Sequence, residues 1–225
     1  MSPPSPAPPA LLTAVVAGAT GLVGRALVTQ LSTHPRFGAV VALVRRPSGL
    51  SGGSVSEQVV DFQSPGSYAG AVKGDVLFSA LGTTLKVAGS EAAQYRVDHD
   101  YQLQVAEAAR GNGVPALVLV SAAGASPRAR IFYSRMKGEL ERDVERLAFP
   151  RTRLLRPGLL DGDGQEDRPG ERWALRLLRP LGPVLPAPLR PIAVATVARA
   201  AIAAALDPAP GLVRCEAAEL FRLGG

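Results

Sequence analysis

A glycine-rich turn between the first strand and the first helix restricts the fold of this chain more than any other feature. An apolar run at 13–17 leads into Gly18, Gly21 and Gly24, a G-x-x-G-x-x-G pattern that opens an amphipathic helix over 21–32. Gly18 allows a sharp turn, Gly21 lets a pyrophosphate approach the backbone, and Gly24 lets the helix pack closely on the strand. The helix N-terminus adds free N–H groups and partial positive charge. These features predict a dinucleotide site at Gly18, Thr20, Gly21, Leu22, Val23 and Gly24.

Apolar runs alternate with amphipathic runs through most of the chain. The apolar runs are nearly continuous, which is typical of parallel strands covered on both faces. Helices are expected over 98–112 and 134–147, between the later runs. This order predicts an α/β fold with a Rossmann-type, doubly wound parallel sheet. Its strands are expected at 13–17, 39–44, 55–62, 75–81, 116–121 and 152–155.

The ends of the chain differ in composition from its middle. Residues 1–11 are proline-rich, and we expect them to form a disordered lead. We interpret residues 12–225 as a single NAD(P)-binding Rossmann domain. Beyond Pro157, prolines and glycines interrupt the pattern until an alanine-rich helix begins at 192. Residues 158–225 are therefore expected to form a small C-terminal substrate lobe folded over the end of the sheet.

Composition excludes several classes of protein. The net charge is +6, but the basic residues are scattered and only 5% of residues are aromatic, so no nucleic acid is expected as a partner. A single cysteine, Cys215, and two histidines exclude an internal disulfide and argue against a metal site. No basic residue precedes Arg25, and no uncharged run reaches the roughly 20 residues of a membrane span. We expect a soluble, cytoplasmic protein without stable membrane insertion.

The strand ends predict which nicotinamide cofactor binds. After the second strand the chain reads Arg45-Arg46-Pro47, with no acidic residue nearby. A basic residue there suits the 2′-phosphate of NADP, whereas an acidic one would bind the ribose of NAD. NADP(H) is therefore favoured over NAD(H), with solvated loop arginines as the alternative interpretation. Two more strand ends are expected at the cofactor: Asp61 and Phe62 beside the adenine, and Ala80, Leu81, Gly82 and Thr83 along the ribose and phosphates.

Tyr133 and Lys137 form a Y-x-x-x-K pattern at the start of a predicted helix. Residues four apart lie on one helix face, and a neighbouring ammonium favours the phenolate form of a tyrosine. Tyr133 could therefore exchange a proton with a carbonyl or hydroxyl oxygen. Ser121 ends the fifth predicted strand, at the edge where doubly wound folds bind ligands, and its hydroxyl could hold the reacting oxygen. We interpret these three residues as candidate catalytic residues.

Together these motifs resemble the atypical short-chain dehydrogenase/reductase family. The chain is similar to the subgroup around the Tat-interactive oxidoreductases and their small bacterial relatives at 80–84, 97–101, 137–141, 155–158 and 165–171. The resemblance covers residues 12–225. It implies NADPH binding, with Ser121, Tyr133 and Lys137 in the catalytic positions. Arg156, Pro157 and Gly158 would lead the chain toward the nicotinamide.

One position departs from the family pattern. Many extended members carry a Ser/Thr pair at the end of the fifth strand, whereas Ala122 follows Ser121 here. The spacing to Tyr133 favours Ser121 as the functional position. The function expected from the resemblance is an NADPH-dependent oxidoreductase acting on a carbonyl or hydroxyl group of a small-molecule substrate.

Two other functions stay open. One is an NADPH-binding regulatory protein with vestigial turnover, and the other is a nucleotide-sugar epimerase or dehydratase. The short stretch of chain after residue 158 argues against the epimerase, because a nucleotide-sugar pocket needs more chain. An oligomer or a protein partner is compatible with the sequence.

Overall fold

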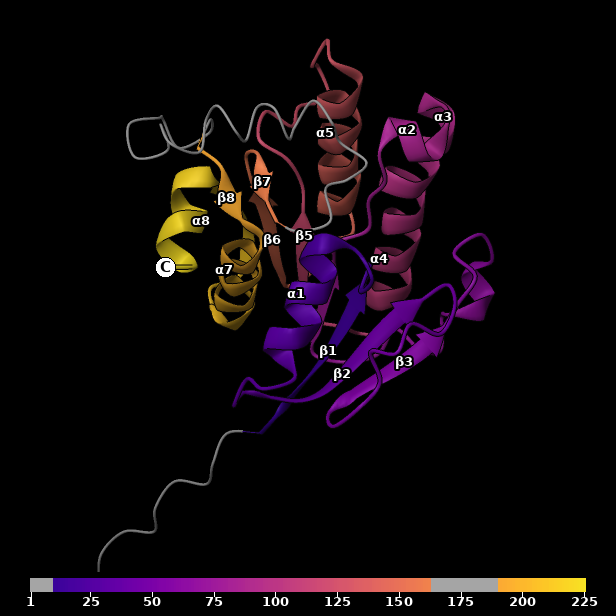
Figure 1. Cartoon of the computed structure of the whole chain (residues 1–225), viewed down its shortest axis with the longest axis vertical. Coiled ribbons are helices and arrows are strands. Elements are labelled where there is room, and N and C mark those ends of the chain that lie inside the picture. The colour runs from indigo at the N-terminus through magenta and orange to yellow at the C-terminus, as the bar shows by residue number, and fades with distance from the viewer. Residues whose placement is uncertain (1–9, 163–189) are drawn as a thin grey trace, which may run out of the picture.

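A parallel sheet of seven strands forms the centre of the computed structural model (Figure 1). The structure describes residues 10–162 and 190–225, so residues 1–9 of the lead and the motif at 165–171 lie outside the described residues. The sheet has the order β3-β2-β1-β4-β5-β6-β9, which confirms the predicted doubly wound fold. Its strands are β1 (Leu12–Ala17), β2 (Phe37–Val44), β3 (Val55–Val59), β4 (Val76–Ser79), β5 (Ala116–Val120), β6 (Arg151–Arg156) and β9 (Gly211–Glu216).

Helices cover both faces of this sheet because successive strand side chains point to opposite faces. In β1, Ala14 and Val16 pack into one buried cluster with α1 and α7, while Val15 and Ala17 pack into a second cluster with α4 and α5. Figure 1 shows these layers on either side of the sheet. The helices are α1 (Leu22–Leu31), α2 (Leu85–Ala88), α3 (Glu91–Tyr95), α4 (Tyr101–Gly111), α5 (Phe132–Glu145), α7 (Val194–Leu206) and α8 (Ala217–Leu223).

The helical region after β4 begins earlier than the sequence predicts. We expected one helix over 98–112, but α2 and α3 precede it, each capped by a side chain. Thr84 accepts a hydrogen bond from the Val87 N–H, and Ser90 accepts one from the Ala93 N–H. Between α3 and α4 the chain forms a π-helical segment, Arg96–Asp100. A π-helical turn inserts an extra residue into the helix and is frequent at functional sites.

Residues 190–225 belong to the central fold, whereas residues 158–225 were expected to form a substrate lobe over the end of the sheet. β9 pairs in parallel with β6 along its whole length and becomes an edge of the main sheet. α7 packs against α1, and its alanines form part of the same buried cluster. The small alanine side chains of α7 let this helix and α1 pack closely on the same face of the sheet. A short pair of strands, β7 (Leu160–Asp161) and β8 (Ile192–Ala193), lies beside this layer.

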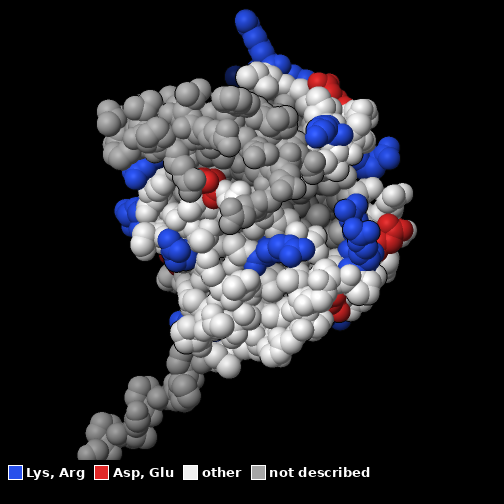
Figure 2. Space-filling model, in the orientation of Figure 1, with Lys and Arg blue, Asp and Glu red and all other residues white. Residues whose placement is uncertain are grey.

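Charged side chains are spread over the surface. On the face drawn in Figure 2, lysines and arginines stand apart from one another across uncharged surface and form no continuous basic patch among the described residues. This distribution agrees with the scattered arginines of the sequence. Among the described residues, no helix is both long enough and apolar enough to cross a bilayer.

Candidate functional site

The glycine turn brings the first strand and the fourth strand into close backbone contact. Gly18 has a φ of +83°, and a Cβ atom placed on it would lie 2.5 Å from the Ala80 carbonyl carbon. A side chain on Gly24 would overlap the Gly18 carbonyl oxygen, so α1 can approach the turn only with glycine there. These two glycines fix the turn. They also place Ala80 and Leu81, two residues predicted to lie along the cofactor, beside the turn.

The N-terminus of α1 opens toward solvent at Gly21. Gly21 is the N-cap and supplies no side-chain cap, so first-turn N–H groups of the helix, including those of Leu22 and Val23, have no intrahelical acceptor. Gly21 and Thr20 are exposed, and a Cβ on Gly21 would meet only the Gly18 oxygen, at 3.4 Å. An exposed helix N-terminus without a cap suits a phosphate group. The residues present therefore fit the pyrophosphate of a dinucleotide.

The end of β2 carries two exposed arginines, Arg45 and Arg46. The loop after them is held by Glu57 of β3, which accepts hydrogen bonds from the Ser48 N–H (3.0 Å) and the Ser48 hydroxyl (2.8 Å). These two bonds hold the pKa of Glu57 below its usual value. Glu57 is thus occupied by Ser48, and the arginines stay available to an anion.

The end of β3 differs from the prediction at Phe62. We expected Asp61 and Phe62 beside the adenine, but the Phe62 ring is buried. It stacks on the Tyr101 ring, and the two ring centres are 6.1 Å apart. Its place is in the core under α4, because the strand ends before it and the chain turns inward. Asp61 is exposed and shapes this turn, accepting bonds from the Gln63 N–H and the Ser64 hydroxyl. Of these two side chains, only that of Asp61 is exposed.

Lys137 is the centre of the candidate catalytic site. It lies on α5 and is buried, and its Nζ is 3.4 Å from Asp98 Oδ1 of the π-helical segment. A buried ammonium needs such a partner, since an uncompensated charge in the interior is costly. The same Nζ lies 5.9 Å from the centre of the Tyr133 ring, one helical turn earlier. Tyr133 itself remains accessible, so the predicted pair is brought together at the carboxyl edge of the sheet.

Asp98 also connects the site to the loop after β4. Its Oδ2 accepts the Thr83 N–H at 2.8 Å, and the Thr83 carbonyl accepts a bond from the Gln94 side chain. Gly82 leaves room for this carboxylate, because a Cβ there would lie 3.3 Å from Asp98 Oδ1. One carboxylate thus fixes both Lys137 and the loop that is expected along the ribose.

Ser121 has a different partner from the one expected. Its hydroxyl is buried and donates to Glu141 Oε1 of α5 at 2.5 Å. Glu141 is also paired with Arg156, whose Nη2 lies 2.6 Å from Glu141 Oε2. Arg156 also forms a second ion pair, in which its Nη1 lies 2.9 Å from Glu216 Oε1 of β9. The chain of contacts ties the ends of β5, β6 and β9 to α5.

This network gives two of the predicted site residues structural partners. The Ser121 hydroxyl is engaged by Glu141. The Arg156 guanidinium is bound by two carboxylates, Glu141 first, which raise its pKa further, and it links the ends of β6 and β9 to α5. Pro157 is buried and Gly158 half-buried beside it, directly after β6. Ala122, the next residue after Ser121, carries no hydroxyl that could replace it.

Asp98 and Glu141 are the residues that sequence reasoning missed as part of the site. Both lie in segments that carry the family resemblance, 97–101 and 137–141, and Glu141 is four residues after Lys137. That spacing places Tyr133, Lys137 and Glu141 on one helix face. An acidic residue at this spacing was the available signal.

Comparison with known proteins identifies the class to which this fold and glycine turn belong. Residues 18–172 match the NAD(P)H-binding family, and the chain belongs to that family. It is 44% identical over 162 residues to Protein FMP52, mitochondrial, of Eremothecium gossypii, covering 71% of each chain. It is 35% identical to Protein fmp52, mitochondrial, of Aspergillus fumigatus, covering 92% of this chain and 93% of the relative.

A similar solved structure is MoeE5 in complex with UDP-glucose and NAD. It has a TM-score of 0.70 and 23% identity, covering 91% of this chain and 75% of the MoeE5 chain. This likeness shows the shared Rossmann fold.

The same comparisons correct two expectations. A cytoplasmic location is wrong, because the relatives at 44% and 35% identity are named mitochondrial. The resemblance to the Tat-interactive subgroup is not what the comparisons return, since these relatives carry the name FMP52. The NAD(P)H-binding class itself is confirmed.

Proposed function

We propose that the chain is an NADPH-dependent oxidoreductase that acts on a carbonyl or hydroxyl group of a small molecule. One observation carries the proposal: Tyr133 is accessible at the sheet edge, and the Lys137 ammonium beside its ring is held by Asp98. The glycine turn and the open N-terminus of α1 lie at the same edge of the sheet. A proton donor and a phosphate cradle at one sheet edge suit nicotinamide chemistry.

The preference for NADPH over NADH rests on Arg45 and Arg46. Both are exposed directly after β2, where the ribose of a dinucleotide bound at the glycine turn would lie. The nearby acidic residue Glu57 of β3 is engaged by Ser48 of their loop and is therefore not placed to bind the ribose hydroxyls. Two guanidinium groups can form charge-assisted bonds with a 2′-phosphate.

In the reaction proposed, Tyr133 donates its hydroxyl proton to the substrate oxygen as a carbonyl becomes an alcohol. The Lys137 ammonium, 5.9 Å from the centre of the Tyr133 ring, stabilises the phenolate left behind. Asp98 holds Lys137 in place through the 3.4 Å ion pair. The nicotinamide supplies the hydride when it is bound. Ser121 has no part in proton transfer and supports α5 through Glu141.

Cofactor titration followed by a turnover screen tests the proposal. Calorimetry with NADPH and NADH measures binding, and loss of NADPH absorbance with aldehydes, ketones and quinones measures turnover. Tight NADPH binding with turnover of at least one carbonyl supports the proposal. Tight binding with none favours a cofactor-dependent regulator, and absence of binding contradicts both.

A further inference from the structure

Arg25 closes the first turn of α1, and its side chain reaches back over the glycine turn. In an α-helix each Cα–Cβ bond tilts toward the N-terminus, so a long side chain at this position can cover the residues before the helix. The Arg25 Nε donates to the Thr20 carbonyl at 2.9 Å. Arg25 is exposed, and none of the ion pairs among the described residues includes it. Its guanidinium is therefore held beside Thr20 with its two Nη groups open to a ligand.

The charge of Arg25 opposes the dipole of its own helix. A helix N-terminus carries partial positive charge, so acidic side chains stabilise it and basic side chains destabilise it. The first turn of α1 has no acidic residue, and the Nε bond to Thr20 holds the Arg25 charge beside the same N–H groups. An anion bound at this end of α1 would face both the open N–H groups and the guanidinium, and would turn an unfavourable arrangement into a favourable one.

The segment around the glycine turn contains no acidic residue at all. Residues 1–56 hold four arginines, and the first acidic residue of the chain is Glu57. Because β1 and β2 are parallel, their carboxyl ends share one edge of the sheet. Arg25 lies at this edge beside the turn, and Arg45 and Arg46 follow β2 there, whereas Arg36 precedes β2 at the opposite edge. A surface with basic side chains and no nearby acid attracts a ligand with several negative charges.

We propose that the Arg25 guanidinium binds the pyrophosphate of the cofactor, together with the N–H groups of α1. The Nε group stays on the Thr20 carbonyl, and the Nη groups form charge-assisted bonds with phosphate oxygens. The proposal rests on the proposed function only in that a nicotinamide dinucleotide binds at the glycine turn, and it requires no turnover. Arg25 then sets the affinity for NADPH and NADH alike, whereas Arg45 and Arg46 set the preference between them.

Calorimetry with NADPH, NADH and ADP-ribose tests this assignment. All three ligands carry the pyrophosphate, and only NADPH carries the 2′-phosphate. Arg25→Ala should raise the Kd of all three by a similar factor, at least about tenfold, as expected for the loss of one charge-assisted hydrogen bond. The ratio of the NADPH and NADH affinities should keep its wild-type value. The loss should shrink at high salt, because Arg25 is exposed.

Arg25→Gln separates the charge from the local structure of the turn. The amide nitrogen of glutamine is the same number of bonds from Cα as the Nε of arginine, so this variant keeps a donor for the Thr20 carbonyl and loses only the charged fork. Its affinity for the three ligands should fall nearly as far as that of Arg25→Ala. Circular dichroism checks that both variants fold.

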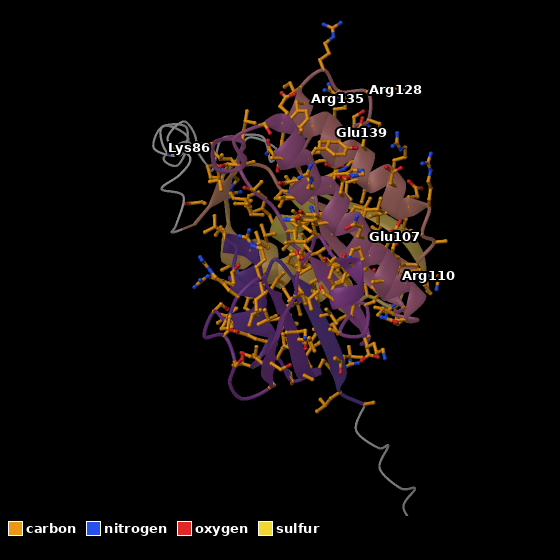
Figure 3. The ribbon with its side chains drawn as sticks, turned by 90° about the vertical axis from the view of Figure 1, so that its right-hand side faces the viewer. Lys86, Glu107, Arg110, Arg128, Arg135 and Glu139 are labelled. Carbon is orange, nitrogen blue, oxygen red and sulfur yellow. The ribbon has the colours of Figure 1, made fainter. Side chains whose placement is uncertain are left out.

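Arg110 offers a matched control at the other end of the molecule. It is exposed, and its Nε also donates to a backbone carbonyl, that of Leu147, at 3.1 Å. Figure 3 shows Arg110 at the end of α4 far from Lys86 and Arg128, which lie toward the carboxyl edge of the sheet. Arg110→Ala and Arg110→Gln remove the same charge and should leave all three Kd values unchanged.

Each outcome supports or overturns the assignment. A loss for NADPH alone would move Arg25 to the 2′-phosphate, and a loss that Arg25→Gln restores would leave it only the bond to Thr20. Unchanged affinity in Arg25→Ala, or equal losses in the Arg110 variants, would also overturn the proposal. Similar losses for the three ligands in a protein that oxidises NADPH with no carbonyl compound would support the role of Arg25 and contradict the oxidoreductase. Wild-type protein that binds none of the three would contradict both.

Discussion

Lys137 Nζ lies 3.4 Å from Asp98 Oδ1, and both side chains are almost fully buried. The pair joins α5 to the π-helical segment before α4. His99, the next residue of the segment, also reaches α5, because its Nε2 lies 3.2 Å from Asp143 Oδ2. Two neighbouring residues of the π-helical segment thus contact α5, and one of them fixes the proposed catalytic lysine.

Asp98→Asn should destabilise the protein. The amide oxygen can still accept the Thr83 N–H, but the buried Lys137 charge loses its partner. Breaking a buried pair from one side costs about 3–5 kcal/mol, so the unfolding free energy in urea should fall by about that much. The double variant Asp98→Asn/Lys137→Met removes both charges and should recover part of the loss. Equal stability of Asp98→Asn and wild type would show that the pair has no energetic role.

Gly21→Val should abolish NADPH binding in a protein that still folds. A Cβ at Gly21 meets only one backbone oxygen, so the fold tolerates the side chain, which would occupy the space where a pyrophosphate would lie. Calorimetry measures the loss, and circular dichroism checks the fold. Gly70→Val is the control, since a Cβ on Gly70 meets nothing within 4 Å and lies away from the turn. Unchanged NADPH affinity would mean that the glycine turn does not bind the pyrophosphate.

Much of the fold could be predicted because its determinants are local. The glycine turn and the continuous apolar strands each depend on residues within one segment, and the structure places them near their predicted bounds. α2 and α3 were missed because 85–95 carries no strong apolar period. Side-chain capping by Thr84 and Ser90 begins these short helices instead.

The partners of the site residues could not be predicted because they are distant in sequence. Ser121 and Glu141 are 20 residues apart, and nothing in the spacing near Ser121 says that its proton goes to a buried carboxylate. The position of the Phe62 ring could not be predicted for a similar reason, because the ring packs on Tyr101, which only the fold brings near. Sequence patterns place residues at an edge of the sheet, and packing then decides which way each side chain points.

Arg45→Ala/Arg46→Ala should weaken NADPH binding and leave NADH binding unchanged. Charge-assisted hydrogen bonds are each worth about 1.5–3 kcal/mol, so losing one contact to the 2′-phosphate should raise the NADPH Kd about 10- to 150-fold. The effect should shrink at high salt, because both arginines are exposed. Arg110→Ala, on the far end of α4, is the matched control. Similar losses for NADPH and NADH would indicate a general charge effect.

Cys215 should be unreactive in the native protein. It is buried, and burial raises the pKa of its thiol to about 11, which leaves about 0.1% thiolate at pH 8. The folded thiol holds its proton more tightly than the unfolded one, so this contribution to stability is present below about pH 9 and is lost as pH rises toward 11. Ellman's reagent at pH 8 should react slowly with native protein and quickly in guanidinium. Fast native reaction would contradict the buried position.

Tyr133→Phe separates catalysis from cofactor binding. The substitution keeps the ring beside Lys137 and removes only the hydroxyl that meets the substrate oxygen. General acid–base groups contribute about 10²–10⁴-fold, so kcat should fall at least about 100-fold while the NADPH Kd changes little. Ser121→Ala is the comparison: because its proton goes to Glu141, it should lower stability and reduce kcat far less than Tyr133→Phe does. Turnover that survives Tyr133→Phe, or that collapses in a folded Ser121→Ala variant with normal NADPH affinity, would move the proton donor from the tyrosine to the serine.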